Sequence, residues 1–203
     1  MTLDKFRPMA DRALQPFVRG AESLGMTPDA VSVLAFAFAG AAAGVFYLAG
    51  TDPRWYLLGA LFVLANGWLD LVDGALAREL DVSSPAGDLL DHVLDRYADI
   101  VIIAGLAAGI GRYGLGLAAV TGVLLTSYLG TQAQAVGLDR VYGGLLGRAD
   151  RLALVGFVGA LAAFLPMQIG GLSLVGWLLV FFAVVGHATA LQRFYYAMKE
   201  LDR

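Results

Sequence analysis

Six long apolar segments occupy most of this 203-residue chain. They run over about residues 30–49, 56–78, 87–110, 113–136, 151–169 and 172–195. A helix that crosses a bilayer needs about 20 predominantly apolar residues, and each segment is close to that length. The chain is 15% charged, whereas a soluble domain is about 25% charged. The sequence therefore predicts an all-α integral membrane protein: one domain over residues 1–203, whose core at 30–195 has six transmembrane helices.

The first 22 residues precede this core and predict an amphipathic helix. Apolar residues recur there at helical spacing: Leu3, Phe6, Ala10, Ala13, Leu14 and Phe17. Charged residues fill most of the positions between them. A helix with one apolar face and one charged face lies in the interface of a membrane, so we expect residues 1–22 to form an interfacial helix.

Basic residues gather on one side of the predicted topology. Arg54 and Arg112 are the only ones in the two loops at 50–55 and 111–113. The other side collects Lys5, Arg7, Arg12, Arg19, Arg78, Arg140, Arg148, Arg151, Arg193, Lys199 and Arg203. Cytoplasmic loops carry such an excess of Lys and Arg. We therefore expect a multi-pass protein of the cell membrane, with both termini and the acidic residues described next on the cytoplasmic side.

An acidic region interrupts the second and third apolar segments. Residues 66–99 hold eight of the seventeen acidic residues: Asp70, Asp73, Glu79, Asp81, Asp88, Asp91, Asp95 and Asp99. Asp70 and Asp73 are three residues apart and share one helix face, and Asp91 and Asp95 are four apart and share another. A carboxylate within a spanning helix costs a few kcal/mol or more. Such a concentration predicts two antiparallel helices whose carboxylates meet around a cation.

The chemistry of these ligands limits the cation. The chain has no Cys and only two His, so the donors are carboxylate oxygens, which suit Mg²⁺, with Mn²⁺ able to substitute. Four facing carboxylates could hold two ions, an arrangement common in phosphoryl chemistry. Small residues at Gly74, Ala77 and Gly87 leave space beside them, and Arg78 offers a planar donor fork for phosphate. The pattern favours a pocket for a diphosphate over simple helix packing.

The residues of this region match a known signature at each of its fixed positions: Asp70, Asp73, Gly74, Ala77, Arg78, Gly87, Asp91 and Asp95. By this spacing the chain resembles the CDP-alcohol phosphotransferase family. The resemblance implies an enzyme of phospholipid biosynthesis that moves a phosphatidyl-type group from a CDP-linked lipid to the hydroxyl of a polar alcohol and releases CMP. It also implies a homodimer with a site open to the cytoplasm.

The resemblance assigns roles to the matching residues. Metal ligands would be Asp70, Asp73, Asp91 and Asp95, which hold two Mg²⁺ ions, and Asp95 would also be the catalytic base on the acceptor hydroxyl. Nucleotide-binding residues would be Gly74, Ala77, Arg78 and Gly87. The segment Thr27-Pro28-Asp29 is similar to the family's Thr-Pro-Asn stretch near the nucleotide, but has Asp in the last position.

The acceptor alcohol is less defined. Arg148 and Arg151 resemble the basic pair that binds the acceptor phosphate in the branch that uses inositol phosphate, although basic flanks are also typical of cytoplasmic loops. That branch carries basic residues after a Ser-Tyr pair. In this chain the pair is Ser127-Tyr128, and residues 127–134 are uncharged. We expect a phosphorylated polyol, glycerol phosphate or inositol phosphate, with inositol or serine as alternatives.

The donor lipid and two rival functions complete the interpretation. Two Lys against twelve Arg and a pI near 5.2 suit a high-GC prokaryote or a halophilic archaeon, so the donor is CDP-diacylglycerol or CDP-archaeol. The net charge of −3 argues against a nucleic-acid partner. The rivals are an intramembrane prenyltransferase of the aspartate-rich type and a divalent-cation transporter. The Gly, Ala and Arg residues between the acids and the clustering of the acids at one end argue against both.

Overall fold

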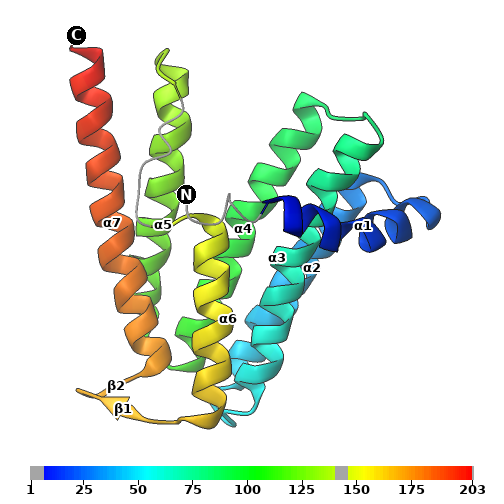
Figure 1. The fold of residues 1–203 in the computed structure, drawn as a ribbon. Helices are drawn as coiled ribbons and strands as arrows, with labels where there is room; N and C mark the ends of the chain where they lie inside the picture. The colour runs from blue at the N-terminus through cyan, green and yellow to red at the C-terminus, as the bar shows by residue number, and fades with distance from the viewer. Residues whose placement is uncertain (1–6, 140–145, 203) are drawn as a thin grey trace.

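The structure, a computed structural model, describes residues 7–139 and 146–202, with side chains from residue 13 onward. It contains seven α-helices and a short β-hairpin (Figure 1). In chain order the elements are α1 Arg7–Ser23, α2 Pro28–Leu48, α3 Trp55–Glu79, α4 Pro85–Gly109, α5 Tyr113–Ala135, α6 Arg148–Phe164, β1 Gln168–Ile169, β2 Leu172–Ser173 and α7 Leu174–Leu201. Each of the six predicted apolar segments therefore contains a helix, although the fifth, 151–169, is helical only to Phe164 and ends in strand β1.

Local capping explains where several helices begin. The hydroxyls of Thr27, Ser84 and Ser173 each accept a hydrogen bond from a backbone N–H three residues further on, at 3.0–3.2 Å. A capping hydroxyl satisfies one of the free N–H groups of the first turn. The proline that follows Thr27 and the one that follows Ser84 fit the first helical position, where no N–H is needed. The hairpin between α6 and α7 turns at Gly170 and Gly171, both at positive φ, and was not predicted.

Four helices of the described chain are long and apolar enough to cross a membrane: α2, α3, α5 and α7. The other two predicted spans fall short for different reasons. Helix α6 has 17 residues, and α4 carries charged residues through its first half. The fold is thus all-helical apart from the hairpin, with the composition of a membrane protein.

Helix α1 lies across the direction of the long helices (Figure 1). It buries Leu14, Val18 and Ala21 against residues of α2 and α3. Phe17 remains 52% exposed and contacts the Trp68 ring edge-on, with 5.2 Å between ring centroids. Leu3 and Phe6, which the sequence places on the apolar face, lie outside the described residues, as does the side chain of Ala10.

Glycines set the closest helix contacts. A Cβ on Gly105 would fall on the Ala43 backbone, and one on Gly109 would fall on the Phe46 carbonyl, so α4 packs directly against α2. Gly186 of α7 packs in the same way against Gly122 of α5, where an added Cβ would lie 2.7 Å from the backbone carbon. Small residues permit such approach in membrane proteins.

We expect Gly186→Ala to destabilise the fold by about 1–3 kcal/mol, because the added methyl overpacks the α5–α7 contact. Gly44→Ala is the matched control, since nothing lies within 4 Å of a Cβ at that exposed position of α2. Thermal unfolding of both variants in detergent measures the difference. Equal midpoints for the two variants would contradict the packing assigned to Gly186.

Helix α6 is the short element that completes the interior. In Figure 1 its N-terminus lies part-way along the bundle, with α5 and α7 on one side and the α3–α4 pair on the other, and all four extend beyond it. It packs against α3 and α7. The first turn of α6 is therefore delivered to the middle of the molecule, beside the acidic residues.

Candidate active site

Helices α3 and α4 carry the acidic residues, and each packs chiefly on α2 instead of on the other. The expectation that they are close antiparallel neighbours is thus met only at the carboxylates. Asp70 of α3 and Asp91 and Asp95 of α4 offer ligand oxygens that all lie within 4.8 Å of one another. Such a group of half-buried carboxylates fits a divalent cation. Three of the four predicted metal ligands therefore lie together.

The fourth predicted ligand, Asp73, is held differently. Its side chain is buried, and its Oδ2 accepts a hydrogen bond from the Ser32 hydroxyl at 2.6 Å. Ser32 lies on α2 and also bonds the Pro28 carbonyl at 3.1 Å. Asp73 lines a cavity together with Asp91, so it lies beside the cluster without being one of its three members.

A cavity of about 670 Å³ opens between α3, α4 and the turn that precedes α2. We call it the α3–α4 cavity. All four predicted nucleotide-binding residues line it: Gly74, Ala77, Arg78 and Gly87. Thr27 and Asp29 line the same space, and a Cβ on Gly87 would lie 3.3 Å from Asp29 Oδ1. The signature residues of two helices therefore converge on one cavity, with Arg78 as its basic group.

A second cavity, of about 590 Å³, lies on the other side of α4. This α4–α5 cavity is lined by Asp95, Arg96, Ser127, Tyr128 and Arg148, among others. A much smaller space lined by Asp70, Asp91, Asp95 and Arg148 lies between the two. The aspartate cluster is thus accessible from both sides of α4, since Asp91 lines the α3–α4 cavity and Asp95 lines the α4–α5 cavity.

Arg148 enters the cluster from the first turn of α6. Its Nη1 lies 2.5 Å from Asp70 Oδ2, and its Nη2 lies 2.8 Å from Asp95 Oδ1. The side chain is 14% exposed, and its Nε has no hydrogen-bond partner among the described residues. One guanidinium therefore bridges carboxylates of two helices.

Arg151, the second member of the predicted acceptor pair, does not reach the α4–α5 cavity. It is buried and donates to Asp99 Oδ2 at 2.7 Å. Arg96 lies between the two groups, 3.7 Å from Asp99 Oδ2 and 3.5 Å from Asp95 Oδ2, and donates to the Ser127 hydroxyl. The contacts thus form one series of alternating acidic and basic side chains: Asp70, Arg148, Asp95, Arg96, Asp99 and Arg151.

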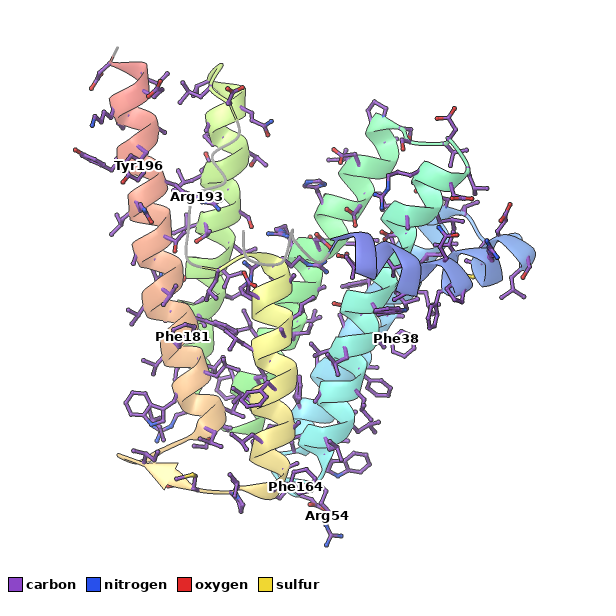
Figure 2. All side chains as sticks on the ribbon, viewed as in Figure 1. Phe38, Arg54, Phe164, Phe181, Arg193 and Tyr196 are labelled. Atoms are coloured by element: carbon purple, nitrogen blue, oxygen red, sulfur yellow. The ribbon has the colours of Figure 1, made fainter. Side chains whose placement is uncertain are left out.

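Three polar side chains that the sequence did not single out make contacts between helices. Ser32 gives no signal beyond one hydroxyl in an apolar segment. Asn66 stands one turn before Asp70 and donates to the Ala35 carbonyl of α2 at 2.9 Å. Arg193, which lies between α7 and α5 in Figure 2, donates to the Thr126 carbonyl at 2.6 Å. A polar residue near an acidic motif could have pointed to Asn66, whereas the other two depend on tertiary contacts.

We expect Ser32→Ala to raise the divalent-cation concentration needed for half-maximal activity by about tenfold. A hydrogen bond to a charged group contributes about 1.5–3 kcal/mol, and here it fixes the orientation of Asp73. The measurement is a metal titration of activity, with Ser23→Ala as the control because that hydroxyl is exposed and donates to the Gly20 carbonyl of its own helix. An unchanged titration for Ser32→Ala would show that Asp73 needs no such support.

Comparison with known protein families and sequences gives a consistent result. The family described as CDP-alcohol phosphatidyltransferase matches residues 25–188. An archaetidylinositol phosphate synthase of Methanothermobacter thermautotrophicus is 32% identical over 98% of this chain and 95% of its own length. A phosphatidylinositol phosphate synthase of Streptomyces avermitilis is 36% identical over 77% of this chain and 68% of its own length.

Solved structures show the same fold. The phosphatidylinositol phosphate synthase PgsA1 of Mycobacterium tuberculosis with CDP-DAG bound has a TM-score of 0.78 at 27% identity, covering 92% of this chain and 94% of the other. The same protein in complex with manganese and citrate has a TM-score of 0.78 at 26% identity, covering 91% and 88%. The two structures of PgsA1 thus hold CDP-DAG in one case and manganese in the other.

Proposed function

Because this chain belongs to the CDP-alcohol phosphatidyltransferase family, we propose that it transfers a phosphatidyl or archaetidyl group from a CDP-linked lipid to a phosphorylated polyol. The acceptor oxygen attacks the phosphorus bonded to the lipid, and the bond from that phosphorus to the bridging oxygen of the diphosphate breaks. CMP leaves, and the hydroxyl proton passes to Asp95. The observation that carries the proposal is the aspartate cluster, reached by one cavity from each side of α4.

The α3–α4 cavity is the donor side. Arg78 is its basic group, and the absence of side-chain bulk at Gly74, Ala77 and Gly87 leaves room for the cytidine diphosphate. Asp70, Asp73, Asp91 and Asp95 would hold the metal, two Mg²⁺ ions for which Mn²⁺ can substitute. When bound, these ions neutralise charge on the diphosphate. Arg78 supplies the chain's own positive charge to the phosphates.

The α4–α5 cavity is the acceptor side, where Asp95 can meet a hydroxyl and Arg148 a phosphate. Arg151 does not line the cavity but supports this side of the site through its hydrogen bond to Asp99. The names of the relatives favour inositol phosphate. Residues 127–134 are uncharged, whereas the branch that uses inositol phosphate carries basic residues there, so glycerol phosphate is the second candidate acceptor. Either CDP-diacylglycerol or CDP-archaeol can supply the lipid.

The membrane arrangement follows from the same site. We place α2 to α7 across the bilayer as six spans and α1 in the interface, since its Phe17 stays exposed beside Trp68. The chain end after α7 and the turn between α3 and α4 lie toward the same end of the bundle (Figure 1). The excess of basic residues on that side makes it cytoplasmic, so both termini and the active site face the cytoplasm. We expect a homodimer.

The test is CMP release by the purified protein with Mg²⁺. Either CDP-diacylglycerol or CDP-archaeol is supplied with inositol phosphate, glycerol phosphate, inositol or serine in parallel, and EDTA-treated protein is the control. We expect release with one phosphorylated polyol and none after EDTA. Release with none of the acceptors and neither donor would overturn the proposal, and the aspartates would then belong to a prenyltransferase or a cation transporter.

A further inference from the structure

The guanidinium of Arg148 lies on carboxylates that the proposed reaction needs for metal. It contacts Asp70 at 2.5 Å and Asp95 at 2.8 Å, and these are two of the three residues whose oxygens could hold a cation together. Arginine forms such bridges well because its planar fork matches carboxylate oxygens. In this arrangement the positive charge that balances the cluster comes from the chain itself.

A divalent ion and Arg148 cannot both engage this cluster unchanged. Asp95 Oδ1 meets Arg148, and its Oδ2 lies 3.5 Å from Arg96 Nη2. Both oxygens of Asp95 are therefore next to a guanidinium, and Asp70 Oδ2 is taken as well. Like charges this close repel strongly at the effective dielectric of a protein. Binding of an ion at Asp70 and Asp95 therefore pushes Arg148 away.

The α4–α5 cavity offers Arg148 a place to go. Arg148 lines this cavity, and its buried Nε has no hydrogen-bond partner among the described residues. It stands in the first turn of α6, directly after Gly147. Once separated from Asp70 and Asp95, its guanidinium has lost the two carboxylates that it contacts and faces an open space, where it can bind a phosphate.

We propose that Arg148 couples metal binding to acceptor binding. Metal at the aspartates releases the guanidinium, and the released guanidinium forms the anion site of the α4–α5 cavity. The coupling is reciprocal, because each ligand favours the same position of Arg148. The acceptor phosphate therefore binds well only to metal-loaded protein. This inference rests on the proposed assignment of metal and acceptor.

The test measures Mn²⁺ affinity of the full chain from the free-ion electron paramagnetic resonance signal, with sulfate as the anion probe and chloride at equal ionic strength as its reference. In wild-type protein we expect sulfate to tighten Mn²⁺ binding by about tenfold, a usual size for coupling between sites. Arg148→Gln is expected to bind Mn²⁺ about tenfold more tightly than wild type without sulfate, and to show no effect of sulfate. Arg148→Lys keeps the charge and should show reduced coupling.

Two further variants locate the effect. Arg78→Gln removes the basic group of the α3–α4 cavity and is expected to retain the coupling. Arg112→Gln changes a residue in the loop between α4 and α5 and is expected to show the same Mn²⁺ affinity and the same effect of sulfate as wild type. Each variant is compared by thermal unfolding with wild type, so that only folded protein is scored.

Three results would overturn the inference. One is a wild-type Mn²⁺ affinity that sulfate leaves unchanged while CMP release is normal, which removes the coupling and leaves the reaction in place. Another is an Arg148→Gln protein that binds Mn²⁺ no more tightly than wild type. A third is protein that neither binds Mn²⁺ nor releases CMP, which removes the proposed function together with the coupling.

Discussion

Asp95→Asn is expected to lower CMP release by about 10²–10⁴-fold, the contribution usual for a general base. Asparagine has nearly the same shape but cannot take the proton of the acceptor hydroxyl at neutral pH. Asp95 is placed for this role because it belongs to the aspartate cluster and also lines the α4–α5 cavity. The measurement is the initial rate of CMP release at saturating donor and acceptor.

Two measurements separate this loss from damage elsewhere. Glu79→Gln, at the exposed end of α3, removes a carboxylate outside the two cavities and is expected to keep the wild-type rate. Mn²⁺ binding by Asp95→Asn shows whether the remaining carboxylates still hold the ion. CMP release within tenfold of wild type would exclude Asp95 as the base.

The buried pair of Asp99 and Arg151 predicts the largest effect on stability. The Asp99 side chain is 4% exposed and that of Arg151 is 8% exposed, with 2.7 Å between them. Removal of one partner leaves an uncompensated buried charge, at a cost of about 3–5 kcal/mol. We expect this loss for Arg151→Met, and a larger one for Asp99→Leu, because Arg96 also lies 3.7 Å from Asp99.

The double variant carries the decisive comparison. With both Asp99→Leu and Arg151→Met no buried charge of this pair is left alone, so most of the stability should return. Thermal unfolding in detergent measures all three variants, and Arg54→Gln, at an exposed loop (Figure 2), is expected to change stability by less than about 0.5 kcal/mol. Single variants as stable as Arg54→Gln would refute the role of the pair.

Periodicity explains why much of the site could be predicted. Asp91 and Asp95 share a face because they are four residues apart on a helix, whatever surrounds it, and the short turn at 80–84 returns the chain from α3 to α4. The apolar lengths predicted every long helix for the same local reason. The contact between Asp73 and Ser32 could not be predicted in this way, because Ser32 lies 41 residues earlier in the chain and on another helix.

Arg148 and Arg151 show the limit of such reasoning. Both belong to a single basic motif in the sequence, and their three-residue spacing places them on one side of a helix. The structure gives them different partners, Asp70 and Asp95 for one and Asp99 for the other. Those partners stand on other helices, so only the packing of α6 against its neighbours could separate the roles. Local spacing predicts a shared face, and tertiary contacts decide which side chain is buried.

Helix α2 contributes few residues to the site, yet both acidic helices, α3 and α4, pack chiefly against it. The distance between Asp70 and the carboxylates of α4 consequently depends on how α3 and α4 pack against α2. Asn66 of α3 donates to a backbone carbonyl of α2, and Gly105 of α4 packs on the α2 backbone. Substitutions on the inner faces of α2 that spread α3 and α4 apart are expected to lose metal while every acidic residue is intact. In a collection of inactive mutants, such variants would be found among residues that never meet a substrate.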